Sequence, residues 1–178
     1  MSEQLLRTLL AEENRLTTVG FQQLYALVQP KVFAFVQYRT TTREQAIDLT
    51  QDILLELYQA LTSFIYHSDA EFYGFLFTIT RRSLARHYAH KHTKATLQQS
   101  DVDIDETVSV IGASELELSV RQALEQLAED ERDIMVLHHW SRYTFAEIGV
   151  MVNMTEGAVR TRHHRARAKL AHLLAVAS

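Results

Sequence analysis

The sequence predicts an all-α protein of two small helical domains joined by an acidic linker. The 178 residues include only 5 Gly and 1 Pro, and β-branched runs are short, which favours helix over sheet. Apolar residues recur every three or four positions along most of the chain. A polar, acidic stretch without sustained periodicity, residues 96–114, separates the helical segments into two groups.

We therefore expect an N-terminal extension over residues 1–20, a first domain over 21–95, the linker over 96–114 and a second domain over 115–178. The absence of cysteine excludes disulfides, thiol catalysis and thiolate metal sites, and it suits a reducing cytoplasm. The first residues carry acids through a short amphipathic stretch, so we expect no signal peptide. No apolar run reaches the roughly 18 residues of a membrane span, and we expect no membrane insertion.

Two helices are predicted early in the first domain. Apolar residues within 21–35 keep helical spacing, and Pro30 should make that helix kink or restart. Thr42 with Gln45 forms a plausible capping box for the next helix, whose apolar stripe covers residues 46–61.

A third helix should begin near Ala70, with an aromatic first half and a basic second half. Aromatic rings beside arginines can stack unpaired bases while the cations follow the nucleic-acid backbone. Aromatic residues at helical spacing can equally belong to a core. The residues concerned are Phe64, Tyr66, Phe72, Tyr73, Phe75, Phe77, Arg81, Arg82 and Arg86.

The second predicted helix carries an acidic stripe, in which Glu44, Asp48, Asp52 and Glu56 recur every four residues. Like charges at this spacing weaken an isolated helix by about 0.2–0.5 kcal/mol per pair. The stripe therefore suggests a basic partner. A solvated face, or pairing with neighbouring arginines, explains it as well.

Charge is distributed unevenly along a chain of formal net charge −4. Residues 80–95 contain basic residues and no acid, residues 96–118 contain acids and no basic residue, and the chain ends in another basic segment. Two basic segments around an acidic connector indicate two modules that bind the same polyanion. Two solvated helix faces joined by a loop are the alternative. Ser114 and Glu117 are a possible capping box for the first helix after the linker.

The most specific pattern is a helix-turn-helix near the C-terminus. Thr144 and Glu147 supply a capping box for its first helix, and Gly149 lies where a side chain would clash between crossing helices. Asn153 tolerates the left-handed backbone that a tight turn needs, and Thr155 caps the second helix. The second helix of such a motif enters the major groove.

On this second helix an exposed sector near the N-terminal end is suited to reading base edges. Its members are Glu156, Arg160, Thr161 and His164, and the capping Thr155 is also an expected DNA contact. Four cations lie further along or to the side, suited to phosphates, namely Arg162, Arg165, Arg167 and Lys169. A basic helix that only maintains solubility is the alternative.

The histidines invite a metal hypothesis, with clusters at His87, His90 and His92, at His138 and His139, and at His163 and His164. Adjacent pairs should point to different sides of a helix, and no carboxylate triad or HExxH pattern accompanies them. We expect no metal site. No Gly-rich phosphate loop or Ser/His/Asp motif is present either, so we expect no cofactor and no enzyme.

The order of these pieces resembles the bacterial extracytoplasmic-function (ECF, group IV) RNA polymerase sigma factors. The stretch AIDLTQDILLELY is similar to their region-two helix, which docks on the clamp helices of the largest polymerase subunit. FYGFLFTITRR is similar to the next helix, which helps open and hold the promoter −10 element. Residues 123–170 resemble the region-four domain, which binds the −35 element and the polymerase flap.

The resemblance implies that Asp48, Gln51 and Asp52 contact polymerase, with Glu44 and Glu56 on the same stripe. The loop over residues 63–70 would hold a flipped −10 base, which costs a few kcal/mol and needs stacking partners. The implied −10 contacts are Phe64, Tyr66, Phe75, Arg81, Arg82 and Arg86. The linker would thread polymerase channels, and an anti-sigma protein commonly covers the polymerase-binding surfaces of such factors.

Several residues depart from the pattern of that family. Phe75 stands where tryptophan is common, and Arg82 and Arg86 stand where asparagine and aspartate are common. The added arginines suggest stronger phosphate contact. Ala128 replaces a frequent proline, and His163 occupies a position usually filled by leucine on the inner face, where burial would favour neutral imidazole.

The competing hypothesis is a stand-alone helix-turn-helix regulator with a helical sensor or dimerisation domain. It would bind duplex DNA without polymerase, usually as a dimer on half-sites about one helical turn apart. The acidic stripe favours the sigma factor, because a regulator that contacts only DNA gains nothing from it.

Overall fold

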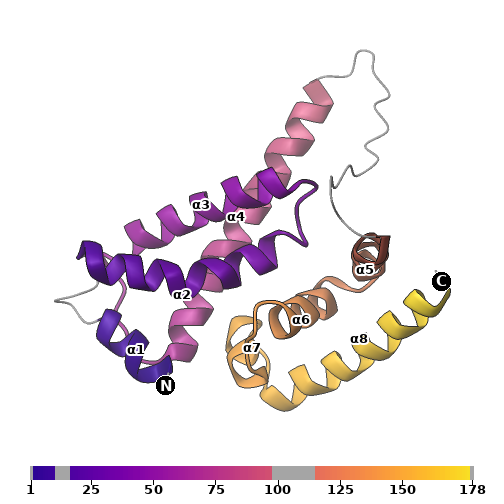
Figure 1. The fold of residues 1–178 in the computed structure, drawn as a ribbon. Helices are drawn as coiled ribbons and strands as arrows, with labels where there is room; N and C mark the ends of the chain where they lie inside the picture. Colours follow the sequence, from indigo (N-terminus) through magenta and orange to yellow (C-terminus); the bar gives the residue numbers. More distant parts are fainter. Residues whose placement is uncertain (1, 11–16, 98–114, 177–178) are drawn as a thin grey trace.

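The computed structural model describes residues 2–10, 17–97 and 115–176, and within them every regular element is an α-helix (Figure 1). The all-α prediction is confirmed. None of the described helices is long and apolar enough to cross a membrane. The helices are α1 (Ser2–Leu9), α2 (Thr18–Val36), α3 (Arg43–Ala60), α4 (Asp69–Leu97), α5 (Glu115–Glu125), α6 (Glu129–His139), α7 (Phe145–Met151) and α8 (Glu156–Val176).

The first group consists of α2, α3 and α4, which contact one another around a core that includes Leu24, Ile53 and Phe72. Helix α2 continues without interruption through Pro30, so the predicted restart does not occur. The expected cap of α3 forms with one difference. Thr42 Oγ1 accepts a hydrogen bond from the Gln45 amide at 3.2 Å, while Gln45 Oε1 accepts from the amide of Thr41 rather than Thr42.

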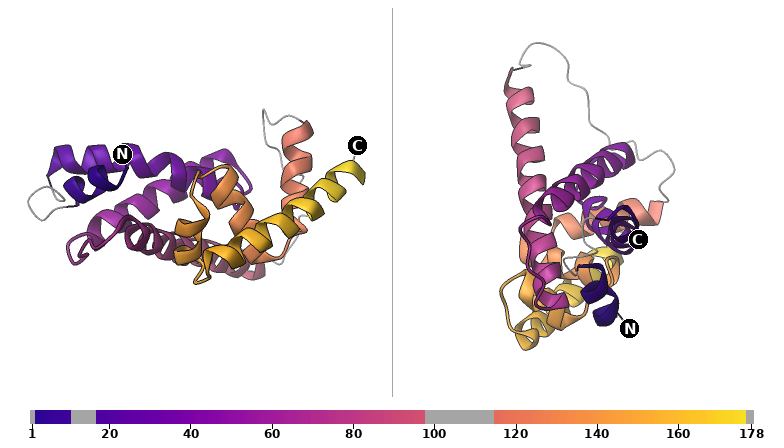
Figure 2. Two further views of the ribbon diagram at one scale, coloured as in Figure 1. Left: turned by 90° about the horizontal axis from the view of Figure 1, so that it is seen from below. Right: turned by 90° about the vertical axis from the view of Figure 1, so that its left-hand side faces the viewer.

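Helix α1 belongs to this group, because it contacts both α2 and α4. Leu6, Leu9 and Leu10 are buried, so the N-terminal extension contributes apolar side chains to the core. Helix α4 is much longer than its neighbours, and its C-terminal end extends beyond the other helices (Figures 1 and 2).

The second group, α5 to α8, contains the helix-turn-helix, whose local features are confirmed. Thr144 and Glu147 form both bonds of the capping box, and Asn153 has a φ of 54°. A Cβ on Gly149 would lie 2.7 Å from the carbonyl oxygen of Met154, so only glycine fits there. Thr155 Oγ1 accepts from the Ala158 amide at 3.2 Å. The predicted Ser114 cap of α5 lies outside the described residues.

The N-cap of helix α6 is the alanine that replaces the family's frequent proline. Ala128 has the extended backbone of an N-cap but no side-chain acceptor. Its amide donates to Glu131 Oε2 at 3.3 Å, which leaves only half of a capping box.

The two groups contact each other, mainly through α4 with α7 and α2 with α6. Lys31 Nζ donates to the Ser141 carbonyl at 3.0 Å, and Ser141 Oγ donates to the Lys31 carbonyl at 3.0 Å. Arg39 and Asp133 form a buried ion pair across the same boundary. The sequence did not predict this closed arrangement, in which the two groups form one body.

Candidate nucleic-acid and protein interfaces

The predicted base-reading sector of α8 is exposed, and two of its side chains pair with each other. Arg160 forms an ion pair of 2.6 Å with Glu156, one turn earlier, and its guanidinium lies 5.5 Å from the centre of the Phe145 ring. Thr161 Oγ1 donates to the Gly157 carbonyl at 2.9 Å, and His164 is exposed. Because 66% of the Arg160 side chain is accessible, it can exchange these partners for a base edge.

The four predicted phosphate contacts divide into two pairs. Arg165 and Arg167 are exposed on α8. Arg162 instead forms an ion pair with Asp130, and Lys169 lies 3.8 Å from Glu131, both in the first turn of α6. The structure therefore directs two of the four cations to a neighbouring helix, where they also complement the acidic N-terminal turn of α6.

Three histidine rings lie together between α6 and α8, contrary to the expectation that adjacent histidines point to different sides of a helix. The rings of His138, His139 and His163 lie about 5 Å apart, because α8 brings His163 onto α6. His139 Nε2 and His163 Nε2 are 2.9 Å apart, so one imidazole donates to the other. Among the described residues no group of three potential ligands is placed to hold a metal ion.

The pKa of His163 is lowered to about 4, first by burial and then by the charges of His139, His138 and Arg167. The expectation of a partly buried, neutral imidazole is confirmed. The pKa of His139 is lowered as well, again mainly by burial.

We expect acid to destabilise the second group of helices through His163. Its folded pKa of about 4 lies below the ordinary 6.5, so the unfolded chain binds the proton more readily. The stabilisation is complete above pH 6.5 and is lost as the pH falls toward 4. In thermal unfolding followed by circular dichroism, His163→Leu should reduce the fall in Tm over this interval. The exposed neighbour provides a control, His164→Leu, and an equal effect of both variants would contradict the assignment.

The aromatic residues predicted near the −10 element also divide. Phe72 and Phe77 are buried core residues, whereas Phe64 and Phe75 are half-buried and stack with ring centres 4.7 Å apart. The Tyr66 hydroxyl donates to Asp69 Oδ1 at 2.7 Å, which ties the loop to the start of α4. Two aromatic rings thus remain accessible beside the loop.

Sequence reasoning missed Ile65, which is 67% exposed between Phe64 and Tyr66. A β-branched apolar residue in a short loop, outside any helical stripe, was the available signal. An exposed apolar side chain beside stacked rings is of the kind that wedges between bases.

The arginines of α4 are engaged by carboxylates. Arg82 and Arg86 both form ion pairs with Glu56 of α3, and Ser83 Oγ donates to Glu56 Oε2 at 2.7 Å. Burial alone would raise the pKa of Glu56. The hydrogen bonds from Ser83, Arg82 and Arg86 outweigh this effect, so the pKa of Glu56 lies below its ordinary value. Arg81 lies 3.0 Å from Glu129 of α6.

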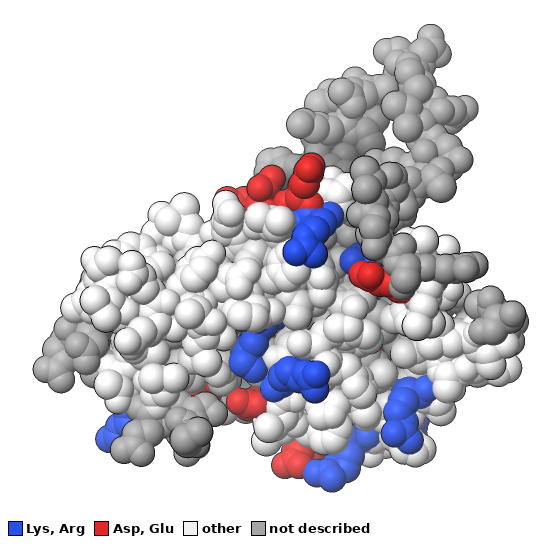
Figure 3. Space-filling view, in the orientation of Figure 1, with Lys and Arg blue, Asp and Glu red and all other residues white. Residues whose placement is uncertain are grey.

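Pairing with neighbouring arginines, one of the alternatives for the acidic stripe, therefore holds for Glu56. The added arginines, Arg82 and Arg86, serve the contact between α3 and α4 rather than presenting unpaired cations to phosphate. Glu44, Asp48 and Asp52 remain exposed on α3. Figure 3 shows acidic side chains gathered at the upper edge of this face, with a basic side chain directly beside them, while the lower part of the face carries both basic and acidic side chains.

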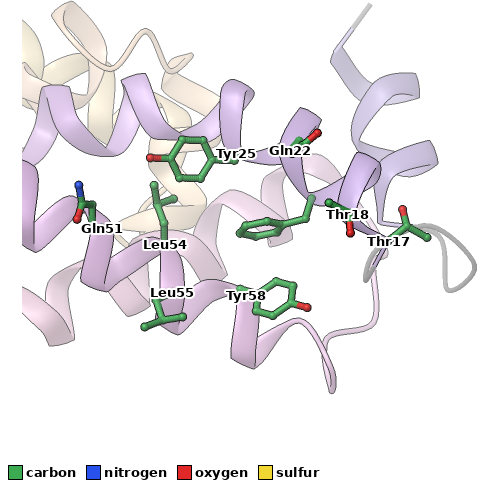
Figure 4. Close-up of a pocket in the computed structure, with 9 residues that line it drawn as sticks. Thr17, Thr18, Gln22, Tyr25, Gln51, Leu54, Leu55 and Tyr58 are labelled. Carbon is green, nitrogen blue, oxygen red and sulfur yellow. The ribbon is translucent and has the colours of Figure 1, made fainter.

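An apolar groove adjoins these acids, between α2 and the exposed side of α3 (Figure 4). Its volume is about 460 Å³. Gln51 lines it, so one predicted polymerase contact lies in the groove, while Leu55 is 57% exposed at its edge. The other lining residues are Thr17, Thr18, Phe21, Gln22, Tyr25, Leu54 and Tyr58.

Helical geometry explains why the acids and the groove meet. At about 100° per residue, Asp48, Gln51 and Leu55 project within one sector of α3. Sequence reasoning missed the groove, although the adjacent pair of Leu54 and Leu55 was a signal, since one apolar stripe cannot bury both equally.

The comparisons with known proteins agree with this geometry. A model of Sigma-70 region 2 matches residues 24–93, and a model of Sigma-70, region 4 matches residues 117–170. The ECF RNA polymerase sigma factor SigM of Mycobacterium tuberculosis is 30% identical over 157 residues, which cover 87% of this chain and 77% of SigM.

Two solved structures are similar in fold. The sigma factor RpoE of Bartonella quintana, in complex with the anti-sigma factor NepR, matches with a TM-score of 0.64 and 26% identity over 88% of this chain and 97% of RpoE. CnrH, in complex with the cytosolic domain of CnrY, matches with a TM-score of 0.67 and 20% identity over 98% of this chain and 97% of CnrH. The chain belongs to the ECF RNA polymerase sigma factors, non-enzymatic DNA-binding regulators that bind core RNA polymerase and promoter DNA in transcription initiation.

Proposed function

We propose that this chain is a group IV sigma factor in which three surfaces divide the work of initiation. The acidic side of α3 docks on the polymerase clamp helices, the loop before α4 holds the −10 element, and α8 reads the −35 element. The working units are residues 21–95 and 115–178, joined by 96–114. The observation that carries the proposal is the exposed acidic and apolar surface of α3, which a protein that contacts only DNA would not need.

The α3 surface has the composition of a protein-docking site. Asp48 and Asp52 are exposed and form no ion pair with any described residue, and the groove beside them presents Leu55 and Gln51. Burying an apolar groove supplies affinity in proportion to area, while exposed carboxylates steer a basic partner into register. A basic helix with an apolar stripe, such as a clamp helix, fits both properties.

The −10 surface is proposed from the stacked pair Phe64 and Phe75 together with Ile65. A flipped base needs an aromatic or apolar partner to replace the stacking that it loses. These three side chains lie in or beside one loop and are at least partly accessible. Arg81 is the predicted −10 cation most easily released, because its pairing with Glu129 is solvent-exposed.

For the −35 surface, we expect Arg160→Ala to weaken −35-dependent transcription by about 1–3 kcal/mol, because a base-reading arginine loses its bidentate contact. Transcription in vitro from two promoters, with and without a −35 element, measures this. Arg165→Ala, which removes a predicted phosphate contact on the same helix, is the comparison variant and should have a similar effect whatever the −35 sequence. Equal loss on both promoters for Arg160→Ala would make that residue a phosphate contact instead.

An anti-sigma protein is proposed as a further partner. RpoE, which shares this fold, was solved in complex with the anti-sigma factor NepR. The groove on α3 is a surface that an inhibitory helix would have to cover to block polymerase. Because polymerase is the first partner, we place the protein in the cytoplasm.

Binding to sigma-free core polymerase at moderate salt, with and without promoter DNA, tests the proposed function. We expect sub-micromolar binding to core, and DNA opening only when polymerase is present. Tight binding to duplex DNA alone, without binding to core, would instead establish a stand-alone regulator.

A further inference from the structure

Phe145 lies beside the predicted base-reading arginine of α8. The guanidinium carbon of Arg160 lies over the Phe145 ring, 5.5 Å from its centre, which is within the roughly 6 Å at which a cation is attracted to an aromatic face. Arg165 and Arg167, the exposed α8 cations predicted to contact phosphate, make no such ring contact within the described part of the chain. The aromatic contact therefore belongs to the arginine that is proposed to read a base.

The Phe145 ring is held in place by its neighbours. Phe145 is the first residue of α7, and the capping box of Thr144 and Glu147 fixes the turn that carries it. His138 of α6 stacks on the ring with the centres 4.3 Å apart, and His138 Nδ1 is itself 3.0 Å from the Tyr143 carbonyl oxygen. The ring is half-buried against the core. It therefore gives Arg160 a contact surface of fixed position.

Phe145 and Glu156 hold different parts of the Arg160 guanidinium. Arg160 Nη2 donates a hydrogen bond to Glu156 Oε1 at 2.6 Å, so the carboxylate engages the edge of this planar group, where the N–H donors lie. An aromatic ring contacts the face of the guanidinium and uses none of its donors. A bidentate contact to a base edge needs the N–H groups. The pair with Glu156 must therefore break when a base is bound, whereas the contact with Phe145 can persist.

We propose that Phe145 is a positioning residue for −35 recognition, which holds the face of the Arg160 guanidinium while its edge bonds to a base. This inference rests on the proposed function of Arg160 as a base reader. A long side chain loses rotamer freedom when it is fixed against a partner, and a contact that already restricts it in the free protein reduces this loss. Phe145 itself has no hydrogen-bond donor, so it cannot replace Arg160 by bonding to a base or a phosphate.

Phe145→Leu tests the proposal, because leucine keeps an apolar side chain at this position but has no aromatic face. Transcription with core polymerase is measured from two promoters, with and without a −35 element. We expect the ratio between them to fall about two- to fivefold, which is the effect of losing an exposed cation–π contact. Phe145→Tyr keeps the aromatic face and should retain the ratio. Circular dichroism verifies that both variants fold.

The effect of Phe145→Leu should depend on Arg160. In the Arg160→Ala background it should cause no further loss, since a positioning residue acts only through the group that it positions. Phe33→Leu is the matched control, because the Phe33 ring is also half-buried and lies 5.5 Å from the guanidinium carbon of Arg43 in the first group of helices. This control should leave the promoter ratio unchanged.

Nuclear magnetic resonance reports the same contact in the free protein, without polymerase. The ring current of Phe145 shifts nearby Arg160 side-chain protons, and Phe145→Leu should remove this shift. Unchanged Arg160 protons, or an equal fall in the promoter ratio with and without Arg160, would overturn the positioning role.

Two further outcomes separate the failure of this inference from the failure of the proposed function. If Arg160→Ala lowers the promoter ratio and Phe145→Leu does not, the positioning role is overturned and base reading by Arg160 stands. If Arg160→Ala reduces transcription equally from both promoters, base reading by Arg160 is refuted, and the role of Phe145 in recognition falls with it.

Discussion

Replacing Asp48 and Asp52 together with lysine is expected to abolish binding to core polymerase while the fold survives. Both carboxylates are exposed beside the apolar groove, so the change introduces two cations where a basic partner would dock. Like charges forced together across an interface cost several kcal/mol, which corresponds to a loss of about 100-fold or more in affinity. Titration of labelled polymerase with the double variant measures the loss.

The fold should tolerate this double substitution because the stripe is unfavourable within α3 itself. Glu44, Asp48 and Asp52 are spaced by four residues and repel one another. A lysine at position 48 would attract Glu44, which offsets the repulsion between the lysines at positions 48 and 52, so we expect an essentially unchanged Tm. Glu71→Lys on α4 reverses an exposed acid outside the docking surface and should leave core affinity unchanged. Full affinity in the double variant would refute docking through α3.

Features set by neighbours in sequence were predictable. The capping box of Thr144 and Glu147 and the left-handed Asn153 depend on a few adjacent residues, and both are found as expected. The cap of α3 shows the limit of this reasoning, because Gln45 reaches Thr41 rather than Thr42. Side-chain reach in a turn depends on backbone geometry that spacing alone does not specify.

Features that depend on how helices pack were not predictable in the same way. Glu56 belongs to a regular acidic stripe in sequence, but only the packing of α4 on α3 brings Arg82 and Arg86 to it. His163 meets His139 across two helices for the same reason. Such pairings are determined by tertiary contacts, whereas periodicity identifies only the face of each helix. The predicted domain boundaries and the role of the linker remain predictions.

The contact between the domains leads to the second large expected effect. The −10 and −35 elements lie about 25 base pairs apart, which is roughly 85 Å of B-DNA at 3.4 Å per base pair. A compact chain of this length has a radius of gyration of about 16 Å. Since α4 contacts α7 in the structure, the two DNA-binding surfaces cannot reach both elements until this contact breaks.

Arg39→Met should open the closed arrangement. The substitution leaves Asp133 as an unpaired charge wherever the interface stays closed, and a broken buried pair costs about 3–5 kcal/mol. In the open arrangement Asp133 gains water, so each domain should stay folded. Because the chain has no cysteine, Gln59→Cys and His172→Cys provide two unique labelling sites on α3 and α8. The distance between spin labels should lengthen, and the affinity for core should rise.

A double substitution separates the loss of the pair from a general loss of packing. Arg39→Met combined with Asp133→Leu replaces the ion pair with apolar side chains, which is often neutral or stabilising at buried sites. The label distance should return to its short value in this variant. If Arg39→Met alone leaves the distance unchanged, the ion pair does not hold the domains together. If the single and double variants open equally, the volume of the side chains rather than their charge controls the contact.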